Sequence, residues 1–176
     1  RNYVQPEQMP YEVGLIFRDG KPVIYDTGDY PALATKALTL IDWAGFEERQ
    51  RQARSEGRYL GIGVASYIEA TGLGPFEGTS VHVQRNGHVL VHTSAAPQGQ
   101  GHQTMIAQVV ASELNARFED ISVKTADTVT IPRGIGTFAS RITPNAAPAA
   151  HQAATSVRTK LIKVAAHMLE AAVEDI

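Results

Sequence analysis

A glycine-rich turn between a predicted strand and a predicted helix constrains this chain most. Residues 88–93 alternate as a strand does, and residues 105–115 have the apolar spacing of an amphipathic helix. Residues 98–104, with the sequence QGQGHQT, lie between them. Such a turn exposes backbone N–H groups at the positive end of a helix dipole, which favours an anion by about 0.3–1 kcal/mol at an exposed site. An ordinary strand-to-helix connection would have the same glycines.

The composition fits one domain with a hydrophobic core and argues against several functional classes. The chain has 176 residues, of which 43% are hydrophobic, and its formal charge of −2 gives no electrostatic reason to expect a nucleic-acid partner. Cysteine is absent, so these residues hold no disulfide, thiolate metal site or catalytic thiol. We predict a cytoplasmic protein without a transmembrane segment or signal peptide. Because the chain begins at Arg1, we expect a piece of a longer polypeptide.

The first part of the chain, residues 1–56, is predicted to be an arm followed by an amphipathic helix. In the arm, residues 13–17 and 23–25 flank Arg18-Asp19-Gly20-Lys21, and Asp-Gly is a strong hairpin signal. Asp29 or Tyr30 should cap one long helix that has Pro31 in its first turn and ends at Gly57. Five residues form its apolar stripe: Leu33, Ala37, Leu40, Ile41 and Ala44.

Residues 57–176 are predicted to form an α+β domain. The element order is β-β-β-α-β-α, which gives a mixed or antiparallel sheet with the helices packed on one face. The last helix should be capped by Asn145 and have Pro148 in its first turn. The predicted elements are a buried strand at 59–70, a hairpin at 79–84 and 88–93 around Arg85-Asn86-Gly87, the helix at 105–115, a strand at 121–124 and a helix at 149–172.

The hairpin places valines and histidines on opposite faces of the sheet. Its register puts Val81, Val83, Val89 and Val91 on one face, with His82 and His88 on the other. A metal site built from His82, His88 and His92 is not favoured, because no carboxylate or cysteine follows at ligand spacing.

A second loop, residues 127–143, shares the design of the first, since it lies just before a predicted helix. If both helices cover one face, both N-termini can point into one crevice. Gln98 and Gln100 would then meet the edge of a flat heterocycle. Ser140, Thr143 and the guanidinium fork of Arg141 would suit phosphate oxygens. Alternatively, Arg141 pairs with an acid such as Asp127 and only orders the loop.

Several motifs, in this order along the chain, resemble the large subunits of molybdenum hydroxylases. The resemblance is to the xanthine dehydrogenase and aldehyde oxidase family, and within it to the carbon monoxide dehydrogenase branch. Gly136-Thr137-Phe138-Ala139-Ser140-Arg141 resembles that family's second cofactor loop, G-T-x-G-S-R. The other matching motifs are Arg1-Asn2-Tyr3, Pro6-Glu7, Pro10-Tyr11, Asp26-Thr27-Gly28-Asp29-Tyr30, Glu77-Gly78, Gln98-Gly99-Gln100-Gly101-His102-Gln103-Thr104, Ala107-Gln108-Val109-Val110-Ala111 and Glu119-Asp120-Ile121.

The resemblance implies a molybdenum–pterin cofactor, molybdopterin, expected as the cytosine dinucleotide. A dithiolene of the pterin holds the metal, so the polypeptide orients the cofactor and need supply few ligands of its own. Gln98, Gln100 and His102 would contact the molybdenum–pterin end, and Gly99 and Gly101 would allow close approach of the backbone. The second loop would contact pterin, pyrophosphate or nucleotide through Thr137, Ala139, Ser140, Arg141 and Thr143.

Two departures from the family pattern concern the second loop. Ala139 stands where the family commonly has Gly, which narrows the allowed backbone angles. Ile142 stands where a small polar residue is usual, which removes a possible hydrogen bond.

The resemblance also implies that the catalytic residues lie outside this chain. The substrate loop would lie upstream and the general-base glutamate downstream, so the fragment alone is expected to be inactive and to bind cofactor weakly or not at all. Iron–sulfur clusters and FAD would lie on partner subunits or domains. The alternative hypothesis is a non-catalytic α+β domain that binds a nucleotide or a protein partner.

Overall fold

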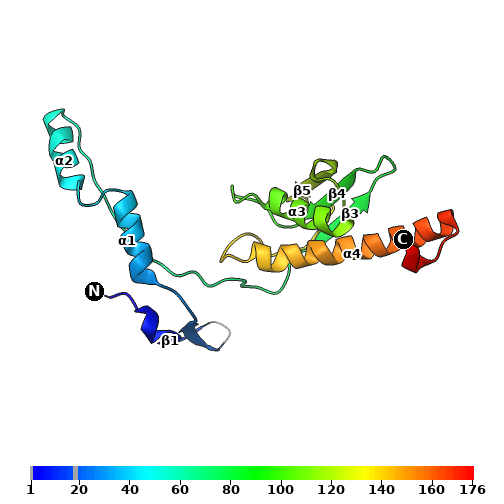
Figure 1. Cartoon of the computed structure of the whole chain (residues 1–176), viewed down its shortest axis with the longest axis horizontal. Coiled ribbons are helices and arrows are strands. Elements are labelled where there is room, and N and C mark those ends of the chain that lie inside the picture. The colour runs from blue at the N-terminus through cyan, green and yellow to red at the C-terminus, as the bar shows by residue number, and fades with distance from the viewer. Residues whose placement is uncertain (1, 18–19) are drawn as a thin grey trace. The chain divides into compact units, whose positions relative to one another are not determined.

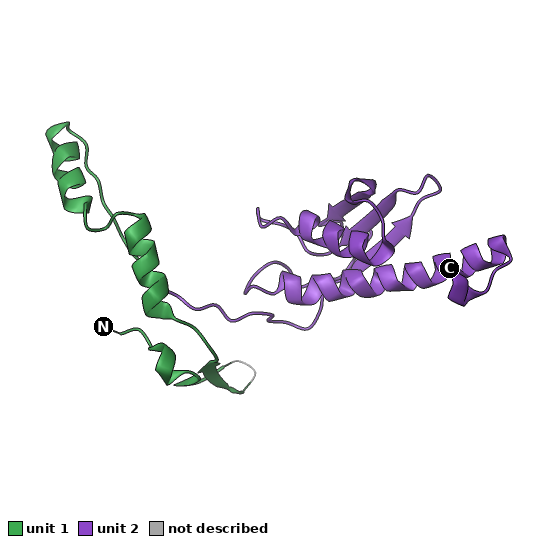
Figure 2. Ribbon diagram, viewed as in Figure 1, with its two compact units in different colours: residues 1–66 green, residues 67–176 purple. Residues whose placement is uncertain are grey.

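The computed structural model describes residues 2–17 and 20–176. The chain divides into two compact units, residues 1–66 and residues 67–176, which Figure 2 distinguishes by colour. The sequence places the boundary earlier, after residue 56, and that domain assignment stays a prediction. Arg1 of the first family motif and Arg18 and Asp19 of the predicted turn lie outside the described residues.

Unit 1 begins with a short 3-10 turn, η1 (Pro6–Gln8), and the predicted hairpin. Strands β1 (Tyr11–Ile16) and β2 (Pro22–Tyr25) pair antiparallel, with an irregularity between Glu12 and Ile16. The hairpin is therefore confirmed, although both strands begin earlier than the alternation indicated.

Two helices replace the single helix predicted after Asp29. They are α1 (Tyr30–Leu40) and α2 (Phe46–Ser55). Asp29 caps α1 as expected, since its carboxylate accepts the Ala32 N–H at 2.9 Å. The break follows from Asp42, which adopts a left-handed φ of 51° and accepts the Gly45 N–H through its side chain at 3.1 Å. This local hydrogen bond offers the backbone an alternative to continuing the helix.

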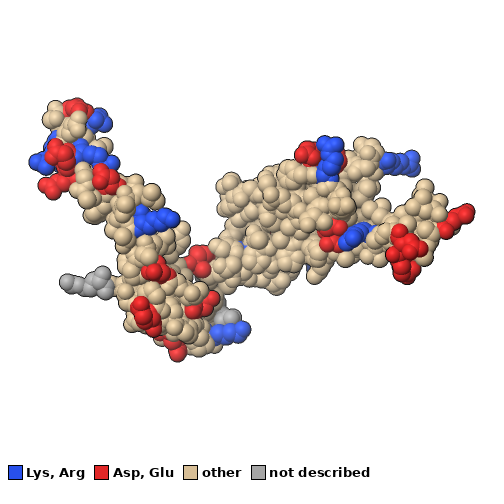
Figure 3. All heavy atoms as spheres, viewed as in Figure 1, with Lys and Arg blue, Asp and Glu red and all other residues tan. Residues whose placement is uncertain are grey.

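The apolar stripe predicted for the single helix is not buried. Leu33 is 68% exposed and Leu40 is 79% exposed, and Ala53 is the buried residue of α2. Charges of both signs intermingle over α2, as Figure 3 shows, and they include an ion pair between Arg51 and Glu48 at 2.5 Å.

The strand predicted at residues 59–70 is wrong. These residues are assigned no strand, and Tyr59 and Tyr67 are 83% and 86% exposed. Apolar, β-prone residues favour a strand only where a neighbouring strand supplies hydrogen bonds, and no strand in the described part of the chain pairs with this segment.

Unit 2 contains a three-stranded mixed sheet. Strand β3 (Thr79–Val83) pairs antiparallel with β4 (Val89–Thr93), and β4 pairs parallel with β5 (Ile121–Thr125). The hairpin turn is confirmed, because Gly87 has a φ of 84° and its N–H donates to the Gln84 carbonyl at 3.0 Å. The register pairs Val81 with Val91 and Val83 with Val89, as predicted.

Two helices lie against this sheet and against each other (Figure 1). They are α3 (His102–Leu114) and α4 (Ile142–Leu169). Besides η1, the described residues contain two more short 3-10 turns, η2 (Phe118–Asp120) and η3 (Val173–Asp175). The α+β class with helices on one face of a mixed sheet is confirmed, but the element order of unit 2 is β-β-α-β-α. Its core contains Val81, Val89, Val91, Ile106, Ala107, Val110, Ile121, Ile142, Ala146, Ala150 and Ala154.

The start of α4 differs from the prediction. The helix begins at Ile142, ahead of Asn145, and Pro148 lies inside it. Its buried positions in the first half recur every four residues as Ile142, Ala146, Ala150 and Ala154, and Ala166 is buried near its end. Alanine side chains let α4 approach its neighbours closely, because the distance between packed helices depends on side-chain size. Larger apolar residues farther along α4 lie outside this core: Leu161, Val164, Met168 and Leu169 are each at least 44% exposed.

None of the helices in the described part of the chain combines the length and the apolarity needed to cross a membrane.

Candidate functional site

The first loop begins beyond β4 and ends in the N-terminus of α3. Gln98, Gly99, Gln100 and Gly101 are exposed. The two glutamine side chains lie together: the Gln98 N–H donates to Gln100 Oε1 at 2.5 Å, and Gln100 Nε2 donates to Gln98 Oε1 at 3.4 Å. Both side chains are exposed and keep further amide N–H donors and carbonyl acceptors that these bonds do not use. The pair can therefore present donors and acceptors to one planar group.

Glycine at the helix start leaves the first turn of α3 open. Gly101 is the N-cap residue, with a left-handed φ of 77°, and the helix has no side-chain cap among the described residues. A Cβ atom built on Gly99 or Gly101 would meet no described atom within 4 Å. The unpaired N–H groups of this first turn therefore border open space, which suits an anionic or polar ligand.

His102 is the first residue of α3, and its side chain is turned inward. The residue is only 6% exposed, and its Nδ1 atom has no hydrogen-bond partner in the described part of the chain. Buried polar atoms are usually paired, so an orphan at the base of an open helix N-terminus points to a group that the chain itself does not supply.

The second loop carries backbone strain. Gly136, Ala139 and Ser140 have φ values of 110°, 47° and 46°. The last two are non-glycine residues in the left-handed region, which costs of order 1 kcal/mol or more for each. Such strain persists where the surroundings hold it, and it concentrates at ligand clamps and active sites.

The two loops lie side by side, as the sequence anticipated. The Thr137 hydroxyl donates to the carbonyl of Ala96, two residues before Gln98, at 2.5 Å. Ser140 and Thr143 are exposed on the same loop and helix start, while Ala139 is half-buried. Ile142 is 4% exposed within the core, so its side chain makes no polar contact.

A buried carboxylate joins these segments. Glu77 is 5% exposed. Its Oε1 accepts the N–H groups of Ile135 and Gly136 at 3.1 and 3.0 Å and a hydrogen bond from Arg141, and its Oε2 accepts the Ser94 hydroxyl. In the sequence, Glu77 belongs to the family motif Glu77-Gly78 and is the one charged residue of the glycine-rich segment 71–78, but neither feature indicates an ion pair with Arg141.

Arg141 occupies a different place from the one expected of a phosphate ligand. The residue is fully buried and pairs with Glu77, and its guanidinium also donates to the carbonyls of Leu73, Phe76 and Gly136. The alternative of an acid partner that orders the loop fits this geometry, although the acid is Glu77. Asp127 instead accepts from Thr130 and the Val129 N–H, which lower the pKa of its carboxyl.

The surroundings of Glu77 keep it ionised. Burial alone would raise its pKa, but hydrogen bonds from Ser94, Arg141 and the N–H groups of Gly136 and Ile135 together hold the pKa below its usual value. The buried guanidinium of Arg141 therefore has a negatively charged partner at neutral pH.

The histidines of the sheet contact other residues of the sheet. His88 Nε2 and the Ser122 hydroxyl are 2.9 Å apart, and the rings of His82 and His92 meet edge-to-face at 6.2 Å between centroids. Within residues 2–17 and 20–176, no group of three or more histidine, aspartate or glutamate side chains is arranged to hold a metal ion.

A family model and two known proteins are similar to this chain along most of its length. Residues 36–176 match a family model described as a molybdopterin cofactor-binding domain. The chain is 36% identical over 176 residues to the gamma subunit of the 6-hydroxypseudooxynicotine dehydrogenase complex of Paenarthrobacter nicotinovorans, covering 100% of this chain and 22% of that protein. It is 34% identical over 184 residues to the carbon monoxide dehydrogenase large chain of Hydrogenophaga pseudoflava, covering 97% of this chain and 22% of that protein.

A solved structure is similar along the same length. The crystal structure of quinoline 2-oxidoreductase from Pseudomonas putida 86 matches with a TM-score of 0.64 and 33% sequence identity, covering 100% of this chain and 23% of that one. The chain thus spans about a fifth of the length of the relatives it matches.

Proposed function

Because this chain belongs to the family of molybdopterin cofactor-binding domains, we propose that it is the cofactor-holding segment of the large catalytic subunit of a molybdenum hydroxylase. The parent would oxidise a small substrate with oxygen taken from water. The observation that carries the proposal is the pair of adjacent loops, in which open glycines and an orphaned buried histidine atom lie at the start of α3.

The first loop would hold the molybdenum–pterin end of the cofactor. The amide groups of Gln98 and Gln100 can donate and accept side by side against a pterin edge, as a planar heterocycle requires. Gly99 and Gly101 would let the backbone approach closely, since no Cβ intervenes. His102 would supply its Nδ1 atom from beneath the loop.

The second loop would hold the rest of the cofactor through its exposed groups. Ser140 and Thr143 carry exposed hydroxyls near the start of α4 that suit pyrophosphate oxygens. A Cβ atom on Gly136 would meet no described atom within 4 Å, so the loop leaves room for a ligand there. Thr137 would fix the spacing to the first loop, and Ala139 would contribute backbone contacts. We assign Arg141 the task of holding this loop from inside, in place of contact with a phosphate.

The parent's remaining parts complete the proposal. The cofactor, which we expect as molybdopterin cytosine dinucleotide, would supply two-electron oxidation of the substrate. This chain contributes binding and orientation and no catalytic residue of its own. Iron–sulfur and flavin subunits or domains and the rest of the large subunit would be its partners. A cytoplasmic location remains a prediction from the sequence.

A matched pair of glutamine variants tests the proposal. Gln100→Ala removes one of the paired amides of the first loop, whereas Gln108→Ala removes an exposed amide farther along α3. Released pterin nucleotide and molybdenum would be measured per large subunit in the purified parent complex. We expect Gln100→Ala to lower both and Gln108→Ala to leave both at the wild-type level. Equal contents in all three proteins would refute the role assigned to Gln100. A well-folded wild-type complex without molybdenum or pterin would favour the alternative, a non-catalytic domain that binds a nucleotide or a protein partner.

A further inference from the structure

Glu77 lies where three segments of unit 2 meet, and its side chain is fully buried. We propose that Glu77 is a positioning residue of the cofactor site, which holds the second loop against the end of β4 and so fixes the separation of the two loops. The inference rests on the proposed function for its link to the cofactor, but the contacts themselves belong to this chain.

Each carboxylate oxygen of Glu77 serves a different segment. Oε1 accepts the N–H groups of Ile135 and Gly136, at 3.1 and 3.0 Å, and so holds the beginning of the second loop. It also accepts from Arg141, the N-cap residue of α4. Oε2 accepts the hydroxyl of Ser94, the residue that follows β4. One side chain therefore joins the strand end, the loop and the helix start.

The backbone packs closely around the carboxylate of Glu77. A Cβ atom placed on Gly134 would stand 2.3 Å from Ser94 Cβ and 2.9 Å from Glu77 Oε2. A Cβ on Gly78, the residue after Glu77, would stand 2.7 Å from Ile131 Cγ2. Both contacts are shorter than real Cβ atoms tolerate, so only glycine fits, and the loop backbone lies directly on the strand end.

Glu77 contacts residues on both sides of the hydrogen bond that joins the loops. Gly136, which it holds, precedes Thr137, whose hydroxyl bonds the Ala96 carbonyl. Ser94, which it also holds, lies two residues before Ala96. Both sides of the Thr137–Ala96 hydrogen bond are therefore fixed by the same carboxylate.

The charge of Glu77 is required as well as its shape. Arg141 is fully buried, and a buried guanidinium without a charged partner is strongly unfavourable. A neutral amide at position 77 could still accept a backbone N–H, but it would leave the guanidinium uncompensated and weaken every hydrogen bond to the group. The loop should then loosen without any change in the residues that face the cofactor.

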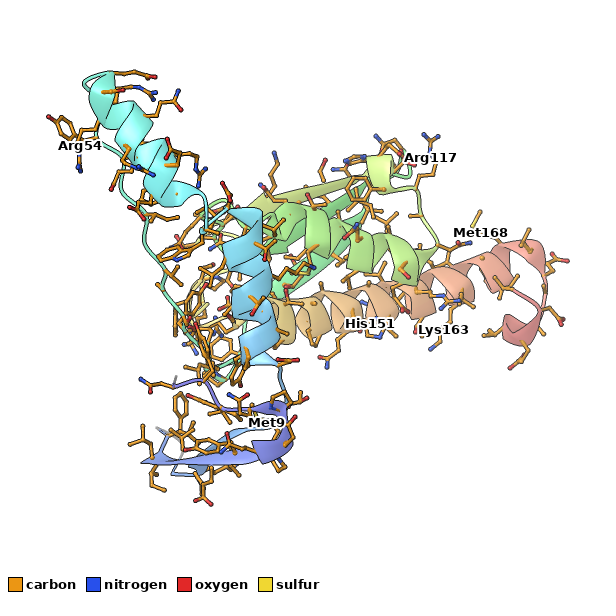
Figure 4. The ribbon with its side chains drawn as sticks, turned by 60° about the vertical axis from the view of Figure 1, so that its left-hand side comes forward. Met9, Arg54, Arg117, His151, Lys163 and Met168 are labelled. Atoms are coloured by element: carbon orange, nitrogen blue, oxygen red, sulfur yellow. The ribbon has the colours of Figure 1, made fainter. Side chains whose placement is uncertain are left out.

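The test uses Glu77→Gln in the full parent complex, with Glu113→Gln as the matched control. Glu113 also lies in unit 2 and pairs with His151 Nδ1 at 3.2 Å and with Arg158 Nη1 at 3.7 Å, between α3 and α4 and away from the loops; His151 is labelled on α4 in Figure 4. The two measurements are retention of pterin nucleotide and molybdenum after dialysis, and hydrogen exchange of the Ile135 and Gly136 amides.

We expect Glu77→Gln to weaken cofactor retention by about 10- to 100-fold, the usual effect of losing a residue that orients the groups around a metal centre. The Ile135 and Gly136 amides should exchange faster, and Glu113→Gln should change neither measurement. If Glu77→Gln unfolds more readily but keeps wild-type retention and wild-type exchange at these amides, the residue has a purely structural role and the inference is overturned.

Two further outcomes keep the test decisive. If Glu77→Gln cannot be purified, Ser94→Ala removes one donor to the carboxylate and leaves the ion pair intact, and the same two effects should appear in weaker form; their absence overturns the inference. If the wild-type complex contains neither molybdenum nor pterin, the proposed function fails, while the exchange measurement still decides whether Glu77 holds the second loop.

Discussion

Removing the charge of Glu77 should destabilise the chain substantially at neutral pH. Breaking a fully buried ion pair by neutralising one partner typically costs about 3–5 kcal/mol. The guanidinium of Arg141 keeps three carbonyl acceptors when Glu77 becomes Gln, those of Leu73, Phe76 and Gly136. These bonds soften the loss, so we expect about 3 kcal/mol, near the lower end of that range.

The pH dependence of this difference follows from the lowered pKa of Glu77. Because the folded pKa lies below the unfolded value of 4.5, the carboxylate stabilises the folded state fully above about pH 4.5. This contribution is lost as the pH falls through the folded pKa, when the carboxyl of Glu77 becomes protonated. The unfolding free energies of the wild-type chain and of Glu77→Gln should therefore differ most at pH 7 and converge in acid.

Urea unfolding of both 176-residue chains, followed by circular dichroism from pH 7 down to about pH 3, measures this difference. A difference under about 1 kcal/mol at pH 7, or one of constant size across the range, would refute the argument, because a buried pair must produce both the magnitude and its loss in acid.

Three further variants test the site and the core by the same unfolding assay. Ala139→Gly should be neutral or stabilising by up to about 1 kcal/mol. Glycine relieves the left-handed φ of 47°, but its greater freedom in the unfolded chain offsets part of this gain. A decrease of more than about 1 kcal/mol in the free energy of unfolding would contradict the strain at Ala139. Thr137→Val should cost about 1 kcal/mol for the lost bond to Ala96, and an unchanged free energy of unfolding would argue against that bond. Ile106→Ala should cost about 2–5 kcal/mol because the side chain is fully buried, and a cost under about 1 kcal/mol would place Ile106 outside the core.

Local sequence patterns were sufficient to predict the β3–β4 hairpin and α3 of unit 2. Alternation in the strands and the Asn86-Gly87 turn were sufficient for the β3–β4 hairpin and its register. The helical spacing of Ile106 and Val110 was sufficient for α3 and its buried face. The resemblance to molybdenum hydroxylase large subunits is confirmed by the family model and by the relatives along nearly the whole chain.

Elements that depend on a partner were not predictable from local pattern. The apolarity of residues 59–70 says that burial is favoured, but it does not say which strand would pair with them. The break between α1 and α2 is held by a few side-chain hydrogen bonds, from the Gly45 N–H to Asp42 and from Arg49 to the carbonyls of Ile41 and Asp42, which compete with helix continuation by a small energy.

For a different reason, the buried ion pair between Glu77 and Arg141 was not predictable. Glu77 and Arg141 are 64 residues apart, and their spacing gives no periodic signal. A charged residue in a glycine-rich segment suggests either a ligand or an ion pair, and only the fold decides between them. The sequence therefore identified the loops, while the structure revealed what holds them together.

The two loops are proposed to hold a molybdenum–pterin cofactor. The most direct test is the molybdenum and pterin nucleotide content of the purified parent complex, measured per large subunit by metal analysis and by chromatography of the released nucleotide. We expect about one molybdenum and one pterin nucleotide per subunit, as a single site requires. A well-folded complex that contains neither would contradict it.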